Sequence, residues 1–174
     1  MKNAPAVILL SLVICVTPNC RQRPGGRLND ADARDISDLV LKMWNEGDLS
    51  IADELYTSDY VRHHPVPEAE ASLDELKATV ISNRSLFPDY RLAFGEMIVE
   101  GDRLIVFATM TGTNTAPLED NAATGNRVRM NGIYIFLIEE KKIAEEWTYF
   151  NLLHYYQQLG YSLAPPESSK RNEQ

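Results

Sequence analysis

Apolar side chains follow a helical period over residues 29–47 and 72–86, and a period close to two from residue 90 onward. In the first segment they are spaced i, i+3, i+4, i+7 and i+8, which forms one continuous stripe along a helix. The stripe consists of Ile36, Leu39, Val40, Met43 and Trp44. We expect this helix to begin at Asn29 or Asp30 and to end at Gly47, because glycine is common just past a helix C-terminus.

Two further helices are predicted before the change of period. Ser50–Tyr56 is expected to be a short helix capped by Ser50. Ser72 and Glu75 fit the capping-box pattern, which marks the start of a third helix. The side chains expected to face the core on that helix are Leu73, Leu76, Val80 and Ile81. Between the second and third helices, Asp59–His64 is expected to be extended.

The second half of the chain reads as four long strands joined by tight turns. The predicted strands are Tyr90–Glu100, Arg103–Thr113, Val128–Glu139 and Lys142–Phe150. Arg103–Thr113 is apolar on both parities, so we expect both faces of that strand to be covered. A polar loop is expected over Asn114–Asn126 and a final helix over Asn151–Leu159.

Helices followed by antiparallel strands predict an α+β fold. We expect three N-terminal helices packed on a strongly curved, mostly antiparallel sheet, which together form a cone that encloses an apolar cavity. With 174 residues, of which 44% are hydrophobic, the chain has room for one such domain. The domain is expected to span 29–162, between a linker at 21–28 and a disordered tail at 163–174.

The first twenty residues differ in kind from the rest. Lys2 precedes the apolar run Ala4–Val16, whose length of about a dozen residues suits a signal peptide better than a membrane span. We therefore expect 1–20 to be a signal peptide and the protein to be exported, either to the periplasm or as a membrane-anchored lipoprotein with a lipid on Cys20. Thr17–Asn19 departs from the usual sequence before a lipidated cysteine, so both forms stay open. The other reading, a buried N-terminal element, fits poorly because 21–26 has no packing pattern.

Composition narrows the set of partners. The formal net charge is −8 and the pI is about 4.9. A surface of that sign repels phosphate backbones, so no nucleic-acid partner is expected. Both cysteines lie before residue 21, so the mature domain is expected to contain neither a disulfide nor a thiol nucleophile.

Strand parity suggests a pocket at the end of the last strand. Glu145, Trp147, Tyr149 and Asn151 share a parity, so on an extended strand they point to one face. A tryptophan, a tyrosine and a carboxamide on one face would suit a half-apolar pocket with a polar contact. Glu145 is then the candidate carboxylate for proton transfer, with burial raising its pKa. The alternative is a cross-strand ion pair with a lysine or arginine.

Other candidate residues come from the rest of the chain. Tyr60, Tyr134 and Met110 are expected to line the cavity, the tyrosines as phenol donors. Trp44 and Trp147 are expected to be core residues first. His64 is either a general base in the pocket or a structural residue before Pro65. His63 and His64 lack a third ligand at suitable spacing, so no metal site is predicted.

Several short motifs, in order, resemble those of the SnoaL-like polyketide cyclases. Residues 59–65 (DYVRHHP) are similar to the family's "DYxxHxP", 87–90 (FPDY) to "FPD(L/Y)", and 100–102 (EGD) to its turn. Residues 142–147 and 157–160 (KIAEEW and QQLG) are similar to its closing signature. The resemblance covers about Asp35–Gly160. It implies the cone-shaped α+β fold of the wider nuclear-transport-factor-like superfamily.

The same resemblance implies cyclisation by an intramolecular aldol step that uses no metal and no cofactor. The family's aspartate base falls at Asn151 and its histidine at Asn114. A carboxamide has no usable basicity, so Asn151 does not replace the base. Asn114 could still donate a hydrogen bond to an oxyanion.

Three functions follow as hypotheses. The first is an exported domain that binds a hydrophobic small molecule in the cone. The second is a cofactor-free cyclase, isomerase or hydratase that acts on a carbonyl compound through Glu145 or His64, with Asn114 and Asn151 polarising the substrate. The third is an interaction domain whose open sheet face forms a homodimer. The loss of the two family side chains favours the first.

Overall fold

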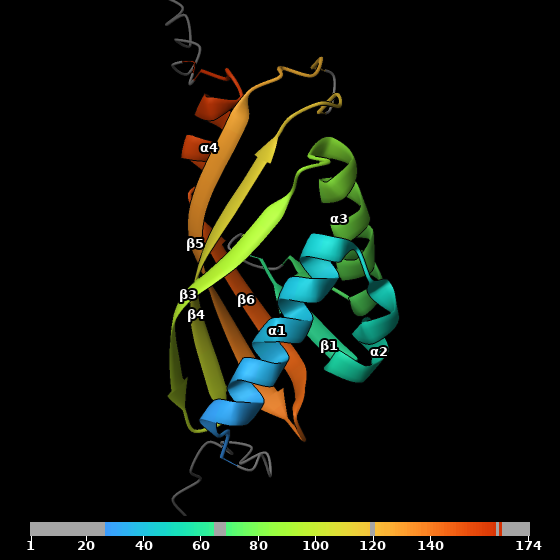
Figure 1. Ribbon diagram of the computed structural model, residues 1–174, viewed down its shortest axis with the longest axis vertical. Helices are drawn as coiled ribbons and strands as arrows, with labels where there is room; N and C mark the ends of the chain where they lie inside the picture. The colour runs from blue at the N-terminus through green and yellow to red at the C-terminus, as the bar shows by residue number, and fades with distance from the viewer. Residues whose placement is uncertain (1–26, 65–68, 119–120, 163, 165–174) are drawn as a thin grey trace, which may run out of the picture.

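A six-stranded sheet curves around a layer of helices (Figure 1). The structure is a computed structural model that describes residues 27–64, 69–118, 121–162 and 164. The expected signal segment 1–20 with Cys20 lies outside the described residues, as do residues 21–26 of the linker and, apart from residue 164, the tail. Among the described residues, no helix is long and apolar enough to cross a membrane.

The elements follow the predicted order closely. The helices are α1 (Asp30–Glu46), the 3₁₀ turn η1 (Leu49–Ile51), α2 (Ala52–Leu55), α3 (Leu73–Leu86) and α4 (Leu152–Gln158). The strands are β1 (Tyr56–His63), β2 (Glu70–Ala71), β3 (Arg91–Glu100), β4 (Arg103–Thr113), β5 (Arg127–Glu139) and β6 (Lys142–Phe150).

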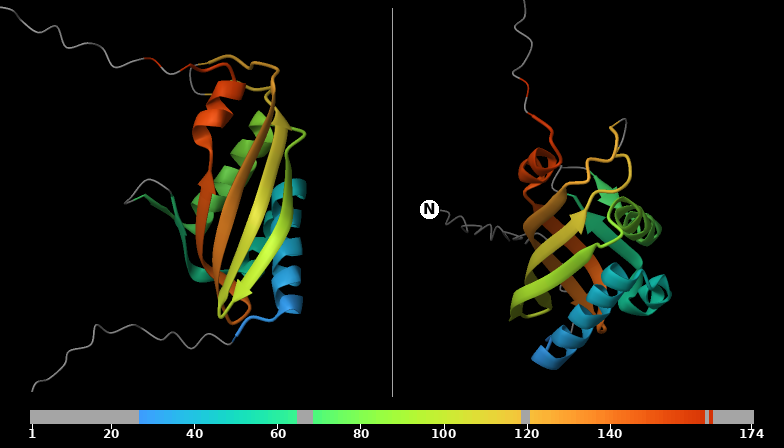
Figure 2. Two further views of the ribbon diagram at one scale, coloured as in Figure 1. Left: turned by 90° about the vertical axis from the view of Figure 1, so that its left-hand side faces the viewer. Right: turned by 45° about the horizontal axis from the view of Figure 1, so that its top comes forward.

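The sheet has the order β2-β1-β6-β5-β4-β3. Every neighbouring pair is antiparallel except β1 and β6, which run parallel. α1, α2 and α3 lie on one side of this sheet (Figures 1 and 2). The predicted α+β cone, with three N-terminal helices on a curved and mostly antiparallel sheet, is confirmed.

Local chemistry explains where the helices begin and end. The Asn29 side chain accepts hydrogen bonds from the backbone at the start of α1, and Gly47 ends the helix at a φ of 75°. The capping box of Ser72 and Glu75 is formed at the start of α3. Two helix details were predicted wrongly. Asp48 rather than Ser50 caps the 3₁₀ turn η1, α2 itself has no side-chain cap, and Ile81 is 59% exposed because it lies on the solvent side of α3.

The helices cover one face of the sheet and leave the other open. On β4, Leu104, Val106 and Met110 point to the helices and are buried. Phe107 points the other way and is 43% exposed. The prediction that both faces of this strand are covered therefore does not hold within one chain. We call the face toward the helices the inner face and the opposite one the outer face.

α4 continues the chain beyond β6 and lies next to β5. β6 ends opposite Gly132, so the first residues of β5 have a free edge there. The Gln158 side chain occupies that edge: it accepts from the Arg129 backbone N–H (2.8 Å) and donates to the Arg129 carbonyl (3.0 Å). Tyr155 meets Phe87 edge-on, which joins α4 to the end of α3.

Candidate functional site

The two faces of β6 carry different chemistry. Ala144, Glu146 and Thr148 are buried on the inner face. Glu145, Trp147 and Tyr149 share a parity, as predicted, but they lie on the outer face, where Tyr149 is 49% exposed. The predicted pocket face is therefore the wrong one of the two. Trp147 is only half-buried, so its expected place in the core is also wrong.

Pairing with the neighbouring strands decides which face is inner. Arg62 of β1 lies opposite Glu146, and Tyr134 of β5 lies opposite Thr148. These partners are buried under the helices. The period of two along β6 alone predicts that its residues alternate, but it does not say which set points inward.

A buried polar cluster, formed by Tyr60, Arg62, Glu146 and Thr148, occupies the inner face. The Tyr60 hydroxyl donates to Glu146 Oε2 (3.0 Å), and Arg62 Nε lies 3.2 Å from Glu146 Oε1. Arg62 Nη2 donates to the Thr148 hydroxyl (3.3 Å). All four residues are buried, and Glu146 is completely so. Sequence reasoning named only Tyr60 of these four.

Aromatic side chains surround the polar cluster. The Arg62 guanidinium carbon lies 5.8 Å from the Trp44 ring centroid, and Trp44 stacks on Tyr90. Tyr56 meets the Tyr60 ring edge-on with centroids 4.6 Å apart. The cluster is thus enclosed by apolar ring surface, where charges interact more strongly than in water.

Burial perturbs the titration of the cluster. It raises the pKa of Glu146, while the charge of Arg62 and the hydrogen bond from Tyr60 act in the opposite direction. Burial also raises the pKa of the Tyr60 hydroxyl, and the neighbouring Glu146 raises it further. We conclude that Tyr60 stays a neutral donor at physiological pH.

Five buried polar side-chain atoms have no hydrogen-bond partner in the part of the chain that the structure describes. They are Trp44 Nε1, the hydroxyls of Tyr56 and Thr57 and, within the cluster, Arg62 Nε and Glu146 Oε1. A buried donor without a partner costs about 1–3 kcal/mol, so such groups usually meet a water molecule or a ligand.

Asn114, the predicted oxyanion donor, anchors a loop. Its side-chain oxygen accepts from the backbone N–H and the hydroxyl of Thr124 (2.8 and 3.2 Å), and its Nδ2 donates to the Ala116 carbonyl (2.8 Å). The side chain is almost completely buried. Because its oxygen and its Nδ2 are already bonded within the chain, the structure gives Asn114 a structural role.

Asn151, at the family's base position, is the N-cap of α4. Its side-chain oxygen accepts from the backbone N–H of His154 (3.0 Å), and the residue is exposed. Asparagine is among the best N-cap residues, so this bond alone explains a polar residue here. Asn114 and Asn151 are both polar for local structural reasons.

The remaining predicted residues divide between the inner face and the surface. Tyr60, Tyr134 and Met110 are buried on the inner face, where they were expected. His64 follows β1 and is exposed. Partial burial lowers the pKa of His64, and the charge of Arg62 lowers it further.

The outer face carries a second polar group. His63 Nε2 and Glu145 Oε2 lie 2.8 Å apart, and the His63 ring stacks on Trp147 with centroids 4.5 Å apart. The Arg103 guanidinium carbon is 5.4 Å from the Trp147 ring. A cross-strand pair was the alternative for Glu145, and the structure pairs Glu145 with His63 of β1.

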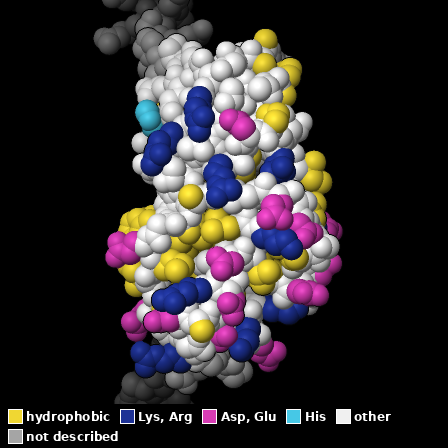
Figure 3. All heavy atoms as spheres, viewed as in Figure 1, with side chains coloured by type: hydrophobic (Ala, Val, Ile, Leu, Met, Phe, Trp, Pro, Cys, Tyr) yellow, Lys and Arg dark blue, Asp and Glu magenta, His cyan; other side chains and the backbone are white. Residues whose placement is uncertain are grey.

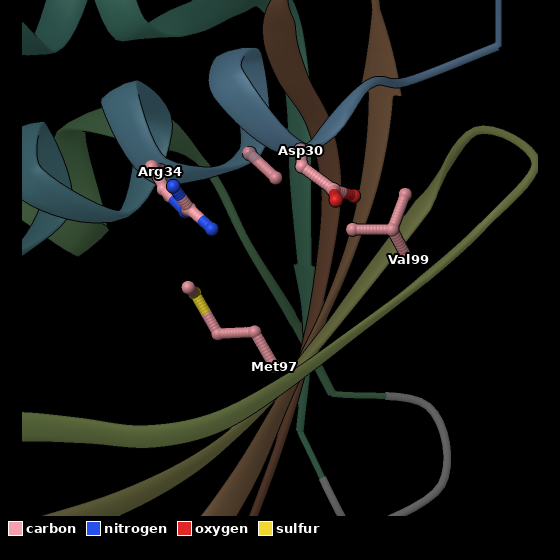
Figure 4. A pocket seen from close by; sticks show the side chains of 5 residues that line it. Asp30, Arg34, Met97 and Val99 are labelled. Carbon is pink, nitrogen blue, oxygen red and sulfur yellow. The ribbon is translucent and has the colours of Figure 1, made fainter.

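A surface hollow of about 190 Å³ lies at the N-terminal end of α1, against β3 (Figure 4). Asp30 and Arg34 of α1 face Met97 and Val99 of β3 across it, and Ala33 completes the lining. None of the predicted site residues lines this hollow. The chemistry of the inner face is separate from it.

Residues 34–159 match the family described as SnoaL-like polyketide cyclase. TsrD from Streptomyces laurentii is a similar solved structure, with 30% identity, a TM-score of 0.68, and coverage of 76% of this chain and 98% of its own. IdmH from Streptomyces antibioticus has 21% identity and a TM-score of 0.67, over 74% of this chain and 99% of its own. A SnoaL-like polyketide cyclase from Agrobacterium tumefaciens has 18% identity and a TM-score of 0.61, over 74% and 98%. No curated protein matched the chain.

Proposed function

Since this chain belongs to the SnoaL-like polyketide cyclase family, we propose that it binds a hydrophobic small molecule between its helices and the inner face of its sheet. The observation that carries the proposal is the enclosed polar cluster, together with the buried polar atoms that lack a hydrogen-bond partner. Each buried polar atom without a partner costs stability. A ligand that meets these groups would explain why they are there.

The family's aldol chemistry is not part of this proposal. The base position holds Asn151 and the histidine position holds Asn114, and both side chains make structural hydrogen bonds. Neither accepts a proton at physiological pH. Binding without that reaction is therefore the simplest function for this interior.

Native mass spectrometry of residues 27–174, purified gently from the cells that make the protein, tests the binding function. We expect a non-covalent adduct of one small molecule that is released when the collision energy is raised. Two variants locate the ligand. If the adduct persists in the double variant Tyr134→Phe/Met110→Ala and is absent from Arg62→Met, the ligand binds at the polar cluster. A domain that is consistently empty from its own cells would contradict the proposal.

A second candidate function is acid–base catalysis on a carbonyl compound. It is favoured by Glu146, a completely buried carboxylate whose pKa is raised by burial. The sequence pointed to Glu145 or His64 for this role, but those side chains lie on the outer face and at the surface. Glu146 would take a proton from the carbon next to the carbonyl, while Arg62 and Tyr60 stabilise the enolate oxygen.

Deuterium exchange measures this activity directly. Acetophenone incubated with the domain in D₂O should exchange its methyl protons faster than in buffer, as followed by proton NMR. Glu146→Gln should remove the acceleration because an amide accepts no proton. The matched control is Glu145→Gln, one residue away on the outer face, which should leave the rate unchanged. Loss of exchange with Glu145→Gln instead would support the assignment from sequence.

The outer face supports a proposal on assembly: the chain forms a homodimer through it. Strand register aligns Ile98, Ile105, Ile135 and Trp147 in one row across four strands. Phe107, Ile133 and Tyr149 form the next row. Ile98, Phe107 and Tyr149 are each more than two-fifths exposed, and a contiguous apolar face of this kind usually contacts another protein surface.

The surface over the helices is different in character. On the view in Figure 3, acidic and basic side chains are intermingled, and apolar side chains lie at the left and along the upper right edge. Native mass spectrometry of residues 27–174 would show the dimer, and the Phe107→Glu variant should be monomeric in the same measurement. A wild-type domain that stays monomeric at high concentration would remove this proposal.

Export remains a proposal that rests on residues 1–20. We propose cleavage after the apolar run, with a lipid on Cys20 as one of two forms. The intact mass of the protein from its own cells separates them, because a lipidated Cys20 adds the mass of its acyl chains. A full-length mass beginning at Met1 would contradict export by cleavage.

A further inference from the structure

The sheet ends at β3, and most of the free edge of this strand is open. At its first residues the edge is closed, because the Asn45 side chain donates to the Leu92 carbonyl (3.0 Å) and accepts from the Leu92 N–H (2.7 Å). Gln158 closes the free edge of β5 in the same way. Among the described residues, positions 93–100 make no backbone hydrogen bond outside the sheet. An open edge of this kind can pair with another strand.

The hairpin between β3 and β4 determines which backbone groups face the free edge. Its two-residue turn begins with Gly101, at a φ of 64°, and makes Glu100 and Arg103 a hydrogen-bonded pair. Backbone groups alternate in direction along a strand, so those of Met97 and Val99 point away from β4. These two residues offer both N–H and C=O groups to an added strand.

The surface hollow described above lies beside this part of the edge. The side chains of Met97 and Val99 form one wall of the hollow, and Asp30, Ala33 and Arg34 of α1 form the other (Figure 4). An added strand would place every second side chain on the same side of the sheet as Met97 and Val99. An open strand edge beside a hollow is suited to an extended peptide, because the edge bonds its backbone and the hollow receives its side chains.

Charge on the other side of β3 indicates which peptide fits. Glu96 and Glu100 are exposed on either side of Ile98, and basic residues opposite them would form cross-strand ion pairs. A second copy of β3 does not supply such residues. Antiparallel pairing centred on Ile98 would place Glu96 opposite Glu100 of the other copy, and like charges in that arrangement are destabilising.

We propose that the free edge of β3, from Met97 to Val99, binds an extended segment of another protein by strand addition. In this segment two apolar residues at alternate positions are flanked on both sides by a basic residue. The apolar side chains enter the hollow, and the basic ones pair with Glu96 and Glu100. The site is separate from the interior of the cone and does not depend on a ligand there.

Three labelled peptides test the proposal against the full chain by fluorescence anisotropy. The first has the core Lys-Val-Thr-Val-Lys and should bind saturably. The second has the same core with both valines N-methylated, which removes the donors to β3, and it should bind at least about tenfold more weakly. The third replaces both lysines with glutamate and should bind most weakly. Equal binding of the first two peptides would overturn strand addition.

Variants locate the site on β3. Glu96→Lys combined with Glu100→Lys should weaken binding of the lysine peptide about tenfold and strengthen binding of the glutamate peptide. The matched control is Glu54→Lys combined with Asp59→Lys, which changes the net charge equally at exposed residues of α2 and β1. It should leave both affinities within about twofold because salt screens distant charges.

A proline variant tests the backbone contact itself. Val99→Pro removes an N–H group that faces the free edge, a position where strands tolerate proline. It should abolish binding of the lysine peptide and leave the far-ultraviolet circular dichroism unchanged.

Four results would overturn the proposal. If the control pair weakens binding as much as the β3 pair, the peptide is held by overall charge. If no peptide binds and the chain self-associates in a way that Val99→Pro abolishes, the occupant is a second copy. If the lysine peptide binds only after residues 1–26 are removed, the occupant is that segment of the chain. Absence of binding in all forms would mean that the edge takes no such segment.

Discussion

Replacing Arg62 with methionine is expected to lower the free energy of unfolding by about 3–5 kcal/mol, the usual cost of leaving one partner of a buried ion pair behind. Glu146 would remain completely buried, with only Tyr60 to stabilise its charge. Urea unfolding followed by far-ultraviolet circular dichroism at neutral pH measures the difference.

The loss should depend on pH in a definite direction. Burial raises the pKa of Glu146 above its ordinary value, so the folded state binds a proton more readily than the unfolded state. The stability that comes from protonated Glu146 is complete below about pH 4.3 and is lost as the pH rises through the raised value. Arg62→Met should therefore be most harmful at neutral and alkaline pH and less so near pH 4.

Two control variants distinguish the effect of losing the ion pair from the effect of losing side-chain volume. Arg62→Met combined with Glu146→Leu removes both charges and should recover much of the stability. Arg103→Met removes an arginine that lies against a tryptophan on the outer face, and it should cost about 1 kcal/mol or less. An Arg62→Met variant as stable as Arg103→Met would mean that Glu146 is solvated.

Trp44→Ala is expected to lower the free energy of unfolding by about 3–5 kcal/mol, and Trp147→Ala by distinctly less. Trp44 is 2% exposed on α1 and packs against Tyr90 and Arg62. Trp147 is half-buried on the outer face, where it stacks on His63, a contact worth about 0.5–1.5 kcal/mol.

Denaturant unfolding of both variants, at a concentration where the domain is monomeric, makes the comparison. From the sequence, both tryptophans are expected to be core residues, whereas the structure places only Trp44 in the core. Equal losses would contradict the assignment of inner and outer faces on β6.

The sequence alone determined the longer helices and the four long strands in their order, because the signals involved are local. The Asn29 and Ser72 caps and the glycine after α1 act within a few residues of themselves. The hairpin turn between β5 and β6 falls at Glu140 and Lys141, which both adopt positive φ. The predicted bounds of β4 and β6 agree with the structure residue for residue.

The interior site needed tertiary structure. Glu145 and Glu146 are adjacent and chemically identical, and only the register with β1 and β5 turns Glu146 inward to Arg62. Asn114 and Asn151 likewise match family positions by sequence, yet their hydrogen bonds belong to a loop and a helix cap. Alternation along a strand is a property of its own backbone, whereas the choice of inner face depends on strands and helices far away in the chain.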